Sequence, residues 1–294
     1  MSTRSATVNG LELAYAEAGP TSGPLALCLH GFPDTAYTWR YLLPVLADAG
    51  YHAVAPFMRG YAPSAIPADG TYQTGALAAD AVGLHEMLGG GDDAVVVGHD
   101  WGALAAYGAG GLAPDRFRRV VGMAVPPVPV SAGGFLSYEQ LQRSFYVFFF
   151  QSALADAVVG AGDLAFVEQL WRHWSPGYDP AADMAEVRRA LGSPEHLAAA
   201  LGYYRAMFGT GGHRPDLAAA QQAADGIPSQ PTLYLHGTDD GCMGAELATG
   251  ASDVLAPGSA VHLVAGAGHF LHLERPAEVN AAILEFLAGE LLAA

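Results

Sequence analysis

The sequence predicts an α/β protein with a mainly parallel, doubly wound sheet and an inserted helical lid. Three observations lead to this prediction: short apolar strands that alternate with helical segments, a long middle stretch without strands, and a return of strands after it. Strands that alternate with helices are typical of parallel sheets covered by helices on both faces. A helical insertion between two halves of one sheet is the simplest account of the middle stretch.

The predicted elements follow one another in the order that such a sheet needs. A hairpin comes first, because apolar and polar residues alternate on both sides of Asn9-Gly10, a pair that is typical of two-residue turns. Apolar runs then predict strands at residues 25–29, 51–55, 94–98, 119–125, 231–236 and 260–264. Helical segments around residues 39–49 and 75–88, and a helix that begins after residue 100, separate the earlier strands. Ligands bind beyond the carboxyl ends of the strands in a sheet of this kind, so functional residues are expected there.

The strand pattern stops at Pro126-Pro127 and resumes near residue 231. The residues between carry helical segments and many aromatic side chains, but no convincing strand. We therefore expect a first part of the core at residues 1–128, a helical lid at residues 129–225 and a second part of the core at residues 226–294. The lid is expected to cover the carboxyl edge of the sheet.

The composition argues against several kinds of partner and location. Of the 294 residues 51% are hydrophobic, the net charge is −16, and every cation is arginine. That charge repels phosphate backbones and anionic lipids, so neither nucleic acid nor a membrane surface is an expected partner. The two cysteines, Cys28 and Cys242, lack metal-ligand spacing and are expected to be reduced thiols. The first residues lack a signal-peptide core, and no apolar stretch reaches the roughly 20 residues of a membrane span. A cytoplasmic protein is expected.

The most informative motif is Gly98-His99-Asp100-Trp101-Gly102. It follows a valine-rich strand and precedes small residues that favour a helix. A strand, a G-x-X-x-G turn and a helix make the nucleophile elbow of the α/β-hydrolase fold, in which the middle residue is exposed on a tight turn. Asp100 is therefore the expected nucleophile. The competing interpretation is an aspartate that only caps the following helix.

An aspartate at this position changes the expected chemistry. A serine that attacked a saturated carbon would leave a stable ether. A carboxylate that attacks the same carbon makes an ester, which water can hydrolyse at its carbonyl carbon. The elbow thus predicts displacement at an sp3 carbon followed by ester hydrolysis, and the absence of an elbow serine disfavours a carboxylic ester hydrolase.

Three further segments complete a catalytic constellation. The turn after the strand at residues 25–29 offers the Phe32 amide as an oxyanion donor beside that of Trp101, the residue after the nucleophile. Asp239 and Asp240 follow the strand at residues 231–236, and spacing alone does not decide which of them is the acid. His269 lies in a Gly-rich loop after the last strand. The order nucleophile, acid, histidine matches the hydrolase arrangement.

Other histidines lie close to these segments. His30 and His99 are expected to be structural rather than catalytic, and His272 is the local competitor of His269. His30 is nevertheless also expected to contribute to the wall of the substrate site. Three further expected substrate-binding residues are Phe32, Trp101 and Phe150.

With these residues in hand, the chain resembles the epoxide hydrolases of the α/β-hydrolase fold, which are related to the haloalkane dehalogenases. The resemblance covers nearly the whole chain. The motifs that carry it are His30-Gly31-Phe32-Pro33 with Trp39-Arg40, Arg59-Gly60-Tyr61, Gly98 to Gly102, and Gly268-His269-Phe270 with Glu274-Arg275-Pro276. This chain departs from the family pattern at Phe57-Met58, at Ala62 and at Gly241-Cys242-Met243.

The resemblance implies two catalytic lid tyrosines and selects the acid. Tyr146 lies five residues before Gln151, and Tyr204 directly precedes an arginine, as in the family. The family's pattern after the strand assigns Asp240 as the acid. Tyr203 is left to lid packing.

Two phenols suit an epoxide, because its leaving group is an alkoxide that must be protonated or strongly hydrogen-bonded as the ring opens. The resemblance implies a hydrolase that needs no cofactor and no metal, with a small apolar epoxide and water as its partners; a homodimer stays open. In the implied scheme Asp100 attacks the epoxide, His269 activates water, and Asp240 orients His269.

Three other functions compete with this one. A haloalkane dehalogenase shares the aspartate elbow and its tryptophan, but a halide needs N–H donors, and Phe32 stands where such enzymes commonly carry asparagine. A fluoroacetate-type dehalogenase normally has arginine in place of Trp101. A ligand-binding protein of the same fold without catalysis would show a broken triad or lost lid donors, and neither is evident.

Overall fold

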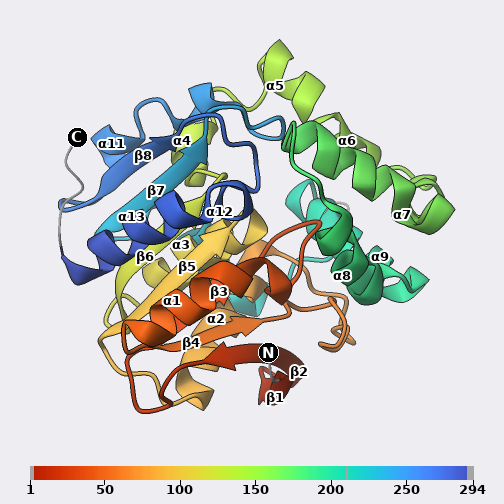
Figure 1. Cartoon of the computed structure of the whole chain (residues 1–294). Coiled ribbons are helices and arrows are strands. Elements are labelled where there is room, and N and C mark those ends of the chain that lie inside the picture. Colours follow the sequence, from red (N-terminus) through yellow and green to blue (C-terminus); the bar gives the residue numbers. More distant parts are fainter. Residues whose placement is uncertain (1–2, 210, 290–294) are drawn as a thin grey trace.

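A computed structural model describes residues 3–209 and 211–289, and one sheet runs through its centre (Figure 1). In the described residues the sheet has eight strands in the order β1-β2-β4-β3-β5-β6-β7-β8. β1 pairs with β2 and β2 with β4 antiparallel, whereas all the later pairs are parallel. The predicted α/β class with a mainly parallel sheet is confirmed. The strands are β1 (Thr3–Val8), β2 (Leu11–Ala18), β3 (Leu25–Leu29), β4 (His52–Pro56), β5 (Ala94–His99), β6 (Phe117–Met123), β7 (Thr232–Gly237) and β8 (Ala260–Val264).

The predicted hairpin is confirmed. Asn9 and Gly10 have φ of 52° and 76°, as the favoured two-residue hairpin turn requires. Along β3 every residue is buried, and successive side chains enter the hydrophobic clusters on opposite faces of the sheet. A strand buried on both faces explains why the run at residues 25–29 is apolar throughout.

Helices cover both faces of the sheet. One layer contains α1 and α13, and the other contains α2, α3 and α10. The helices of the core and the short helical turns beside them are η1 (Ala36–Tyr41), α1 (Leu42–Asp48), α2 (Thr74–Met87), α3 (Trp101–Leu112), η2 (Pro215–Leu217), α10 (Ala218–Ala224), η3 (Ala245–Ala248), α11 (Ala251–Val254), α12 (Leu271–Glu274) and α13 (Pro276–Ala288).

The expected helical insertion lies between β6 and β7, and its longer helices gather at one end of the sheet (Figure 1). Its helices are α4 (Val128–Ser131), α5 (Tyr138–Arg143), α6 (Phe145–Phe149), α7 (Ala155–Trp174), α8 (Ala181–Leu191) and α9 (Pro194–Met207). An ion pair of 2.7 Å between Arg40 and Asp183 ties α8 to the core. The indole of Trp171 adds a hydrogen bond of 2.9 Å to the Pro33 carbonyl.

One boundary of the expected lid needs correction. The expected range, 129–225, includes α10, but this helix packs against α2 and α3 on the sheet. Gly75 and Gly108 permit the close approach, since a Cβ on either would lie within 3 Å of α10 atoms. We therefore assign α10 to the core and end the lid before η2.

No helix among the described residues is both long and apolar enough to cross a membrane. Cys28 and Cys242 are both buried free thiols.

Candidate active site

Asp100 occupies the sharp turn between β5 and α3. Its φ of 54° and ψ of −120° lie in a region that costs a non-glycine residue about 1–3 kcal/mol and that is typical of functional sites. The side chain makes no capping hydrogen bond to α3, so the interpretation as a mere helix cap is wrong.

The two glycines of the elbow are needed because a side chain at either position would collide with neighbouring backbone. A Cβ on Gly98 would lie 2.0 Å from the carbonyl oxygen of Gly102, and a Cβ on Gly102 would lie 2.0 Å from the carbonyl oxygen of Leu29. Both contacts are with backbone that cannot move aside. The turn therefore brings the end of β3 close to the start of α3.

This approach places the predicted oxyanion donor beside Asp100. The Phe32 amide donates a hydrogen bond of 2.7 Å to Oδ1 of Asp100. Oδ2 of the same carboxylate lies 3.6 Å from Nε2 of His269. One carboxylate oxygen is thus held by the backbone, and the other faces the histidine.

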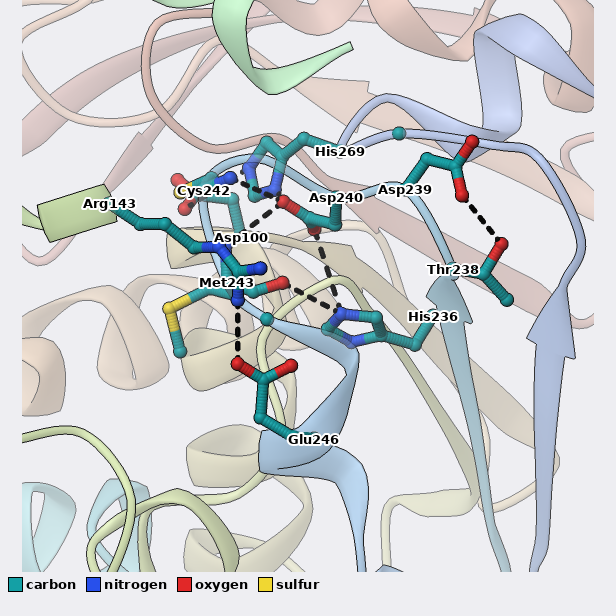
Figure 2. Close-up of polar contacts among 12 residues, drawn as sticks. Asp100, Arg143, His236, Thr238, Asp239, Asp240, Cys242, Met243, Glu246 and His269 are labelled. Carbon is teal, nitrogen blue, oxygen red and sulfur yellow. Dashed lines mark hydrogen bonds and ion pairs between the residues drawn. The ribbon is translucent and has the colours of Figure 1, made fainter. Parts of the chain in front are cut away.

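Asp240, and not its neighbour Asp239, is the acid that reaches His269 (Figure 2). Oδ2 of Asp240 lies 2.9 Å from Nδ1 of His269. Oδ1 accepts hydrogen bonds from the backbone amides of Cys242 and Met243, at 2.7 and 2.9 Å. Asp239 is exposed and accepts a hydrogen bond from the hydroxyl of Thr238. The structure thus distinguishes the two carboxylates, between which the spacing in the sequence did not decide.

The electrostatics of His269 follow from its two carboxylate neighbours. Burial by itself would lower the pKa of this imidazole, but the charge of Asp240, the neighbouring Cys242 and the interaction with the Asp100 carboxylate outweigh burial and raise the pKa well above its usual value. The neighbouring groups therefore favour the charged form of the ring in the free protein. Its Nε2 has no hydrogen-bond partner among the described residues.

The ring nitrogens of two neighbouring histidines, His30 and His99, hydrogen-bond backbone groups. Nδ1 of His30 lies 2.9 Å from the Gly31 carbonyl, and its Nε2 accepts the Met58 amide at 3.0 Å. Burial lowers the pKa of His30 to about 4. Nε2 of His99 lies 2.9 Å from the His269 carbonyl, and burial lowers the pKa of His99 as well. His99 thus supports the backbone of the catalytic loop.

His272 does not replace His269. It is buried and its Nε2 bonds the hydroxyl of Thr38. Burial lowers its pKa to about 3. The ring is therefore neutral and packs in the interior of the core.

The lid tyrosines are held by the residues that define their motifs. Gln151 follows Tyr146 in the lid and donates a hydrogen bond of 2.8 Å to the carbonyl of Tyr204 on α9. Arg205 follows Tyr204 and donates one of 3.1 Å to the carbonyl of Phe150. Each motif therefore reaches across to the segment of the other tyrosine. The two phenol rings meet edge to face, with centroids 5.6 Å apart.

Both phenols keep their protons, as a proton donor must. Burial, followed by neighbouring groups that include the Asp100 carboxylate, raises the pKa of Tyr146 and Tyr204 well above the usual value. The hydroxyl of Tyr204 is buried without a hydrogen-bond partner among the described residues. The hydroxyl of Tyr203 instead donates to the Arg59 carbonyl at 2.8 Å, in agreement with its expected packing role.

A cavity of about 300 Å³ joins these groups. Asp100, Tyr146 and Tyr204 line it together with Trp101. The other lining residues, nearly all of them apolar, are Leu104, Val125, Val128, Ser131, Ala132, Phe135, Leu136, Val147, Met207, Phe208 and Met243.

Three expected substrate-binding residues do not line this cavity: His30, Phe32 and Phe150. Both ring nitrogens of His30 hydrogen-bond backbone groups. The rings of Phe32 and Phe150 are fully buried and pack against Tyr204, at 5.2 and 5.0 Å between centroids. They form a layer behind the tyrosine instead of the wall of the cavity.

Sequence reasoning missed two residues beside His269. The ring of Trp174 packs against His269 and Tyr146, at 5.1 and 4.9 Å between centroids. The thiol of Cys242 lies 3.3 Å from the hydroxyl of Tyr146. Cys242 belongs to the segment that departs from the family pattern, and that departure was the only signal in the sequence.

The comparisons with known proteins agree with this geometry. The model of the alpha/beta hydrolase fold family matches residues 24–276. The chain is 35% identical to "Epoxide hydrolase A" of Mycobacterium tuberculosis over 96% of this chain and 95% of the relative. The crystal structure of Epoxide Hydrolase A from Mycobacterium thermoresistibile has a TM-score of 0.80 and 32% identity, and covers 98% of both chains.

A haloalkane dehalogenase variant from Bradyrhizobium elkanii also superposes, with a TM-score of 0.81 over 98% of this chain and 96% of its own. Its identity is only 24%, and this likeness shows the fold alone. The family assignment therefore depends on the sequence relatives and on the site. The chain belongs to the α/β-hydrolase fold family and, within it, to the epoxide hydrolases.

Proposed function

We propose that this protein hydrolyses small apolar epoxides to vicinal diols, without a cofactor, through a covalent ester on Asp100. One observation carries the proposal: the elbow carboxylate, which faces His269, shares an apolar cavity with the two lid phenols. The assay that tests it measures diol formation from a panel of styrene-type, aliphatic and bulky epoxides. Absence of diol from every member of the panel would overturn the proposal.

The first half-reaction opens the ring. Oδ2 of Asp100 attacks an epoxide carbon. Oδ1 keeps its hydrogen bond from the Phe32 amide and becomes the carbonyl oxygen of the ester. The carbon–oxygen bond of the ring breaks as the new ester bond forms. Tyr146 and Tyr204 hydrogen-bond the departing oxygen and supply its proton.

The second half-reaction cleaves the ester. Alkylation makes Asp100 neutral and so removes one of the groups that raise the pKa of His269, which favours loss of the second ring proton. The neutral ring then takes a proton from water, and Asp240 stabilises the imidazolium that forms. The amides of Phe32 and Trp101 stabilise the tetrahedral oxyanion. As the tetrahedral species collapses, the bond from the carbonyl carbon of Asp100 to Oδ2 breaks and the imidazolium protonates Oδ2, which leaves with the diol. The oxygen of water stays on Asp100, and its remaining proton returns to the lid tyrosine that was deprotonated in the first half-reaction.

Removal of one phenol at a time tests the first half-reaction. Tyr146→Phe and Tyr204→Phe are each expected to slow alkylation by about tenfold to a hundredfold, because one donor remains. The double variant is expected to lose about 10⁴-fold. Rapid-mixing measurements of the tryptophan fluorescence change on alkylation give these rates.

Tyr203→Phe is the matched control, since this hydroxyl bonds the Arg59 carbonyl outside the cavity. It should alkylate at close to the parent rate. Equal rates for all three single variants would contradict the assigned roles of Tyr146 and Tyr204.

The pKa of His269 gives the second half-reaction a defined pH dependence. Ester cleavage needs the neutral ring, so its rate is expected to rise with pH and to level off above the pKa of His269 in the alkylated protein. Rapid-quench measurements of ester breakdown across a pH series test this. A rate that falls as pH rises through this range would argue against His269 as the base.

The dehalogenase alternative remains testable with the same protein. Chloroalkane and bromoalkane substrates are expected to release no halide, because Phe32 offers no side-chain N–H. Halide release faster than diol formation would reverse the assignment. The cytoplasmic location stays a prediction, and the oligomeric state stays open.

A further inference from the structure

Three side chains with metal-binding donors lie close together, and one of them is the proposed base, His269. One donor atom each of Asp240, Cys242 and His269 lies within 4.8 Å of the others, and all three residues are buried. Figure 2 shows them next to one another at the end of β7. The ring nitrogen Nε2 of His269 lacks a hydrogen-bond partner among the described residues.

The donors match the chemistry of one class of ion. A thiolate, an imidazole and a carboxylate are the ligands that zinc takes in proteins, and the soft sulfur favours zinc or cadmium over magnesium or calcium. We propose that Asp240, Cys242 and His269 form an inhibitory site for a thiophilic divalent cation such as Zn²⁺.

The local backbone prepares this site. Cys242 follows Asp240 by two residues, and the turn between them is fixed because Oδ1 of Asp240 accepts the amides of Cys242 and Met243. The thiol touches the hydroxyl of Tyr146, which lines the cavity.

Binding of the ion would stop the reaction at the base. The thiol releases its proton to solvent as sulfur binds the ion, and the imidazole releases its second proton as its nitrogen binds. Coordination occupies an imidazole lone pair or breaks the pair between Asp240 and His269, so that the ring no longer takes a proton from water. The dication also compensates for the anionic charge of the thiolate beside Asp240 and Asp100. Removal of the ion by a chelator restores activity.

The first test measures inhibition, and this part depends on the proposed epoxide hydrolysis. The full-length protein is freed of metal and assayed for diol formation from styrene oxide at increasing ZnCl₂. We expect inhibition that EDTA reverses. Cys242→Ser keeps a hydroxyl beside Tyr146 but loses the soft donor, and should need at least about tenfold more Zn²⁺, relative to its own metal-free rate, which corresponds to about 1.4 kcal/mol.

Cys28→Ser is the matched control, because it removes the other buried thiol, which lies in β3. It should keep the sensitivity of the parent. Equal Zn²⁺ sensitivity of Cys242→Ser and the parent would overturn the proposal, since the ion would then act through other groups.

The second test does not need turnover. Titration with CdCl₂ is expected to produce the ultraviolet band of a cadmium–thiolate bond in the parent and in Cys28→Ser, but not in Cys242→Ser. If the parent protein forms no such band, the site is refuted whatever its substrate. A band without any epoxide hydrolysis supports the site and refutes the proposed function, so the two failures are distinguishable.

Discussion

Asp100→Ala is expected to abolish diol formation, with a loss in kcat/KM of about four orders of magnitude or more. The reason is that no other carboxylate takes its place: Asp240 is committed to His269 and to two backbone amides. The measurement is the rate of diol formation from styrene oxide at high protein concentration.

Two controls accompany this variant. Asp239→Ala removes an exposed carboxylate one residue from the acid and should keep nearly full activity. Thermal unfolding of Asp100→Ala should show a folded protein, since the Asp100 carboxylate does not cap α3. A folded Asp100→Ala protein with substantial activity would mean that the nucleophile is another group.

His269→Gln is expected to separate the two half-reactions. Alkylation needs Asp100 and the lid phenols, all of which this variant keeps. Ester cleavage needs the imidazole, so epoxide should be consumed in a burst of one equivalent per protein and then stop. Rapid-quench measurement of epoxide consumption, with intact-mass detection of the adduct, gives both quantities.

The matched control is His262→Gln, because His262 lies on the surface and pairs with Glu278 at 3.1 Å. It should turn over continuously. Sustained turnover by His269→Gln at the parent rate would show that His269 is not the base.

The sheet and the elbow could be predicted because they depend on local patterns. Runs of apolar residues at strand length and turn residues such as Asn9-Gly10 are read within a few positions. The G-x-D-x-G motif is equally local, and its glycines meet backbone on both sides. Asp100, His269 and the pair Asp239-Asp240 were predicted from motifs at the ends of strands, where a parallel sheet brings distant residues together. The choice of Asp240 over Asp239 came from the family resemblance.

The remaining features depend on contacts between distant segments. The end of the lid was placed one helix too late, because the packing of α10 on α2 and α3 leaves no local signature. His30 was assigned to the substrate wall, although its ring bridges two backbone segments instead. The meeting of Cys242 with Tyr146 joins residues 96 positions apart, and no pattern within either segment shows it.

The origin of the new oxygen in the diol tests the central claim most directly. The wild-type protein, in excess over styrene oxide, is mixed with water enriched in the heavy oxygen isotope, and the diol of the first turnover is analysed by mass spectrometry. A covalent ester on Asp100 requires that this diol carry ordinary oxygen from the carboxylate, and that heavy oxygen appear only in later turnovers. Heavy oxygen in the first-turnover diol would mean that water attacks the epoxide directly, and the ester mechanism would be wrong.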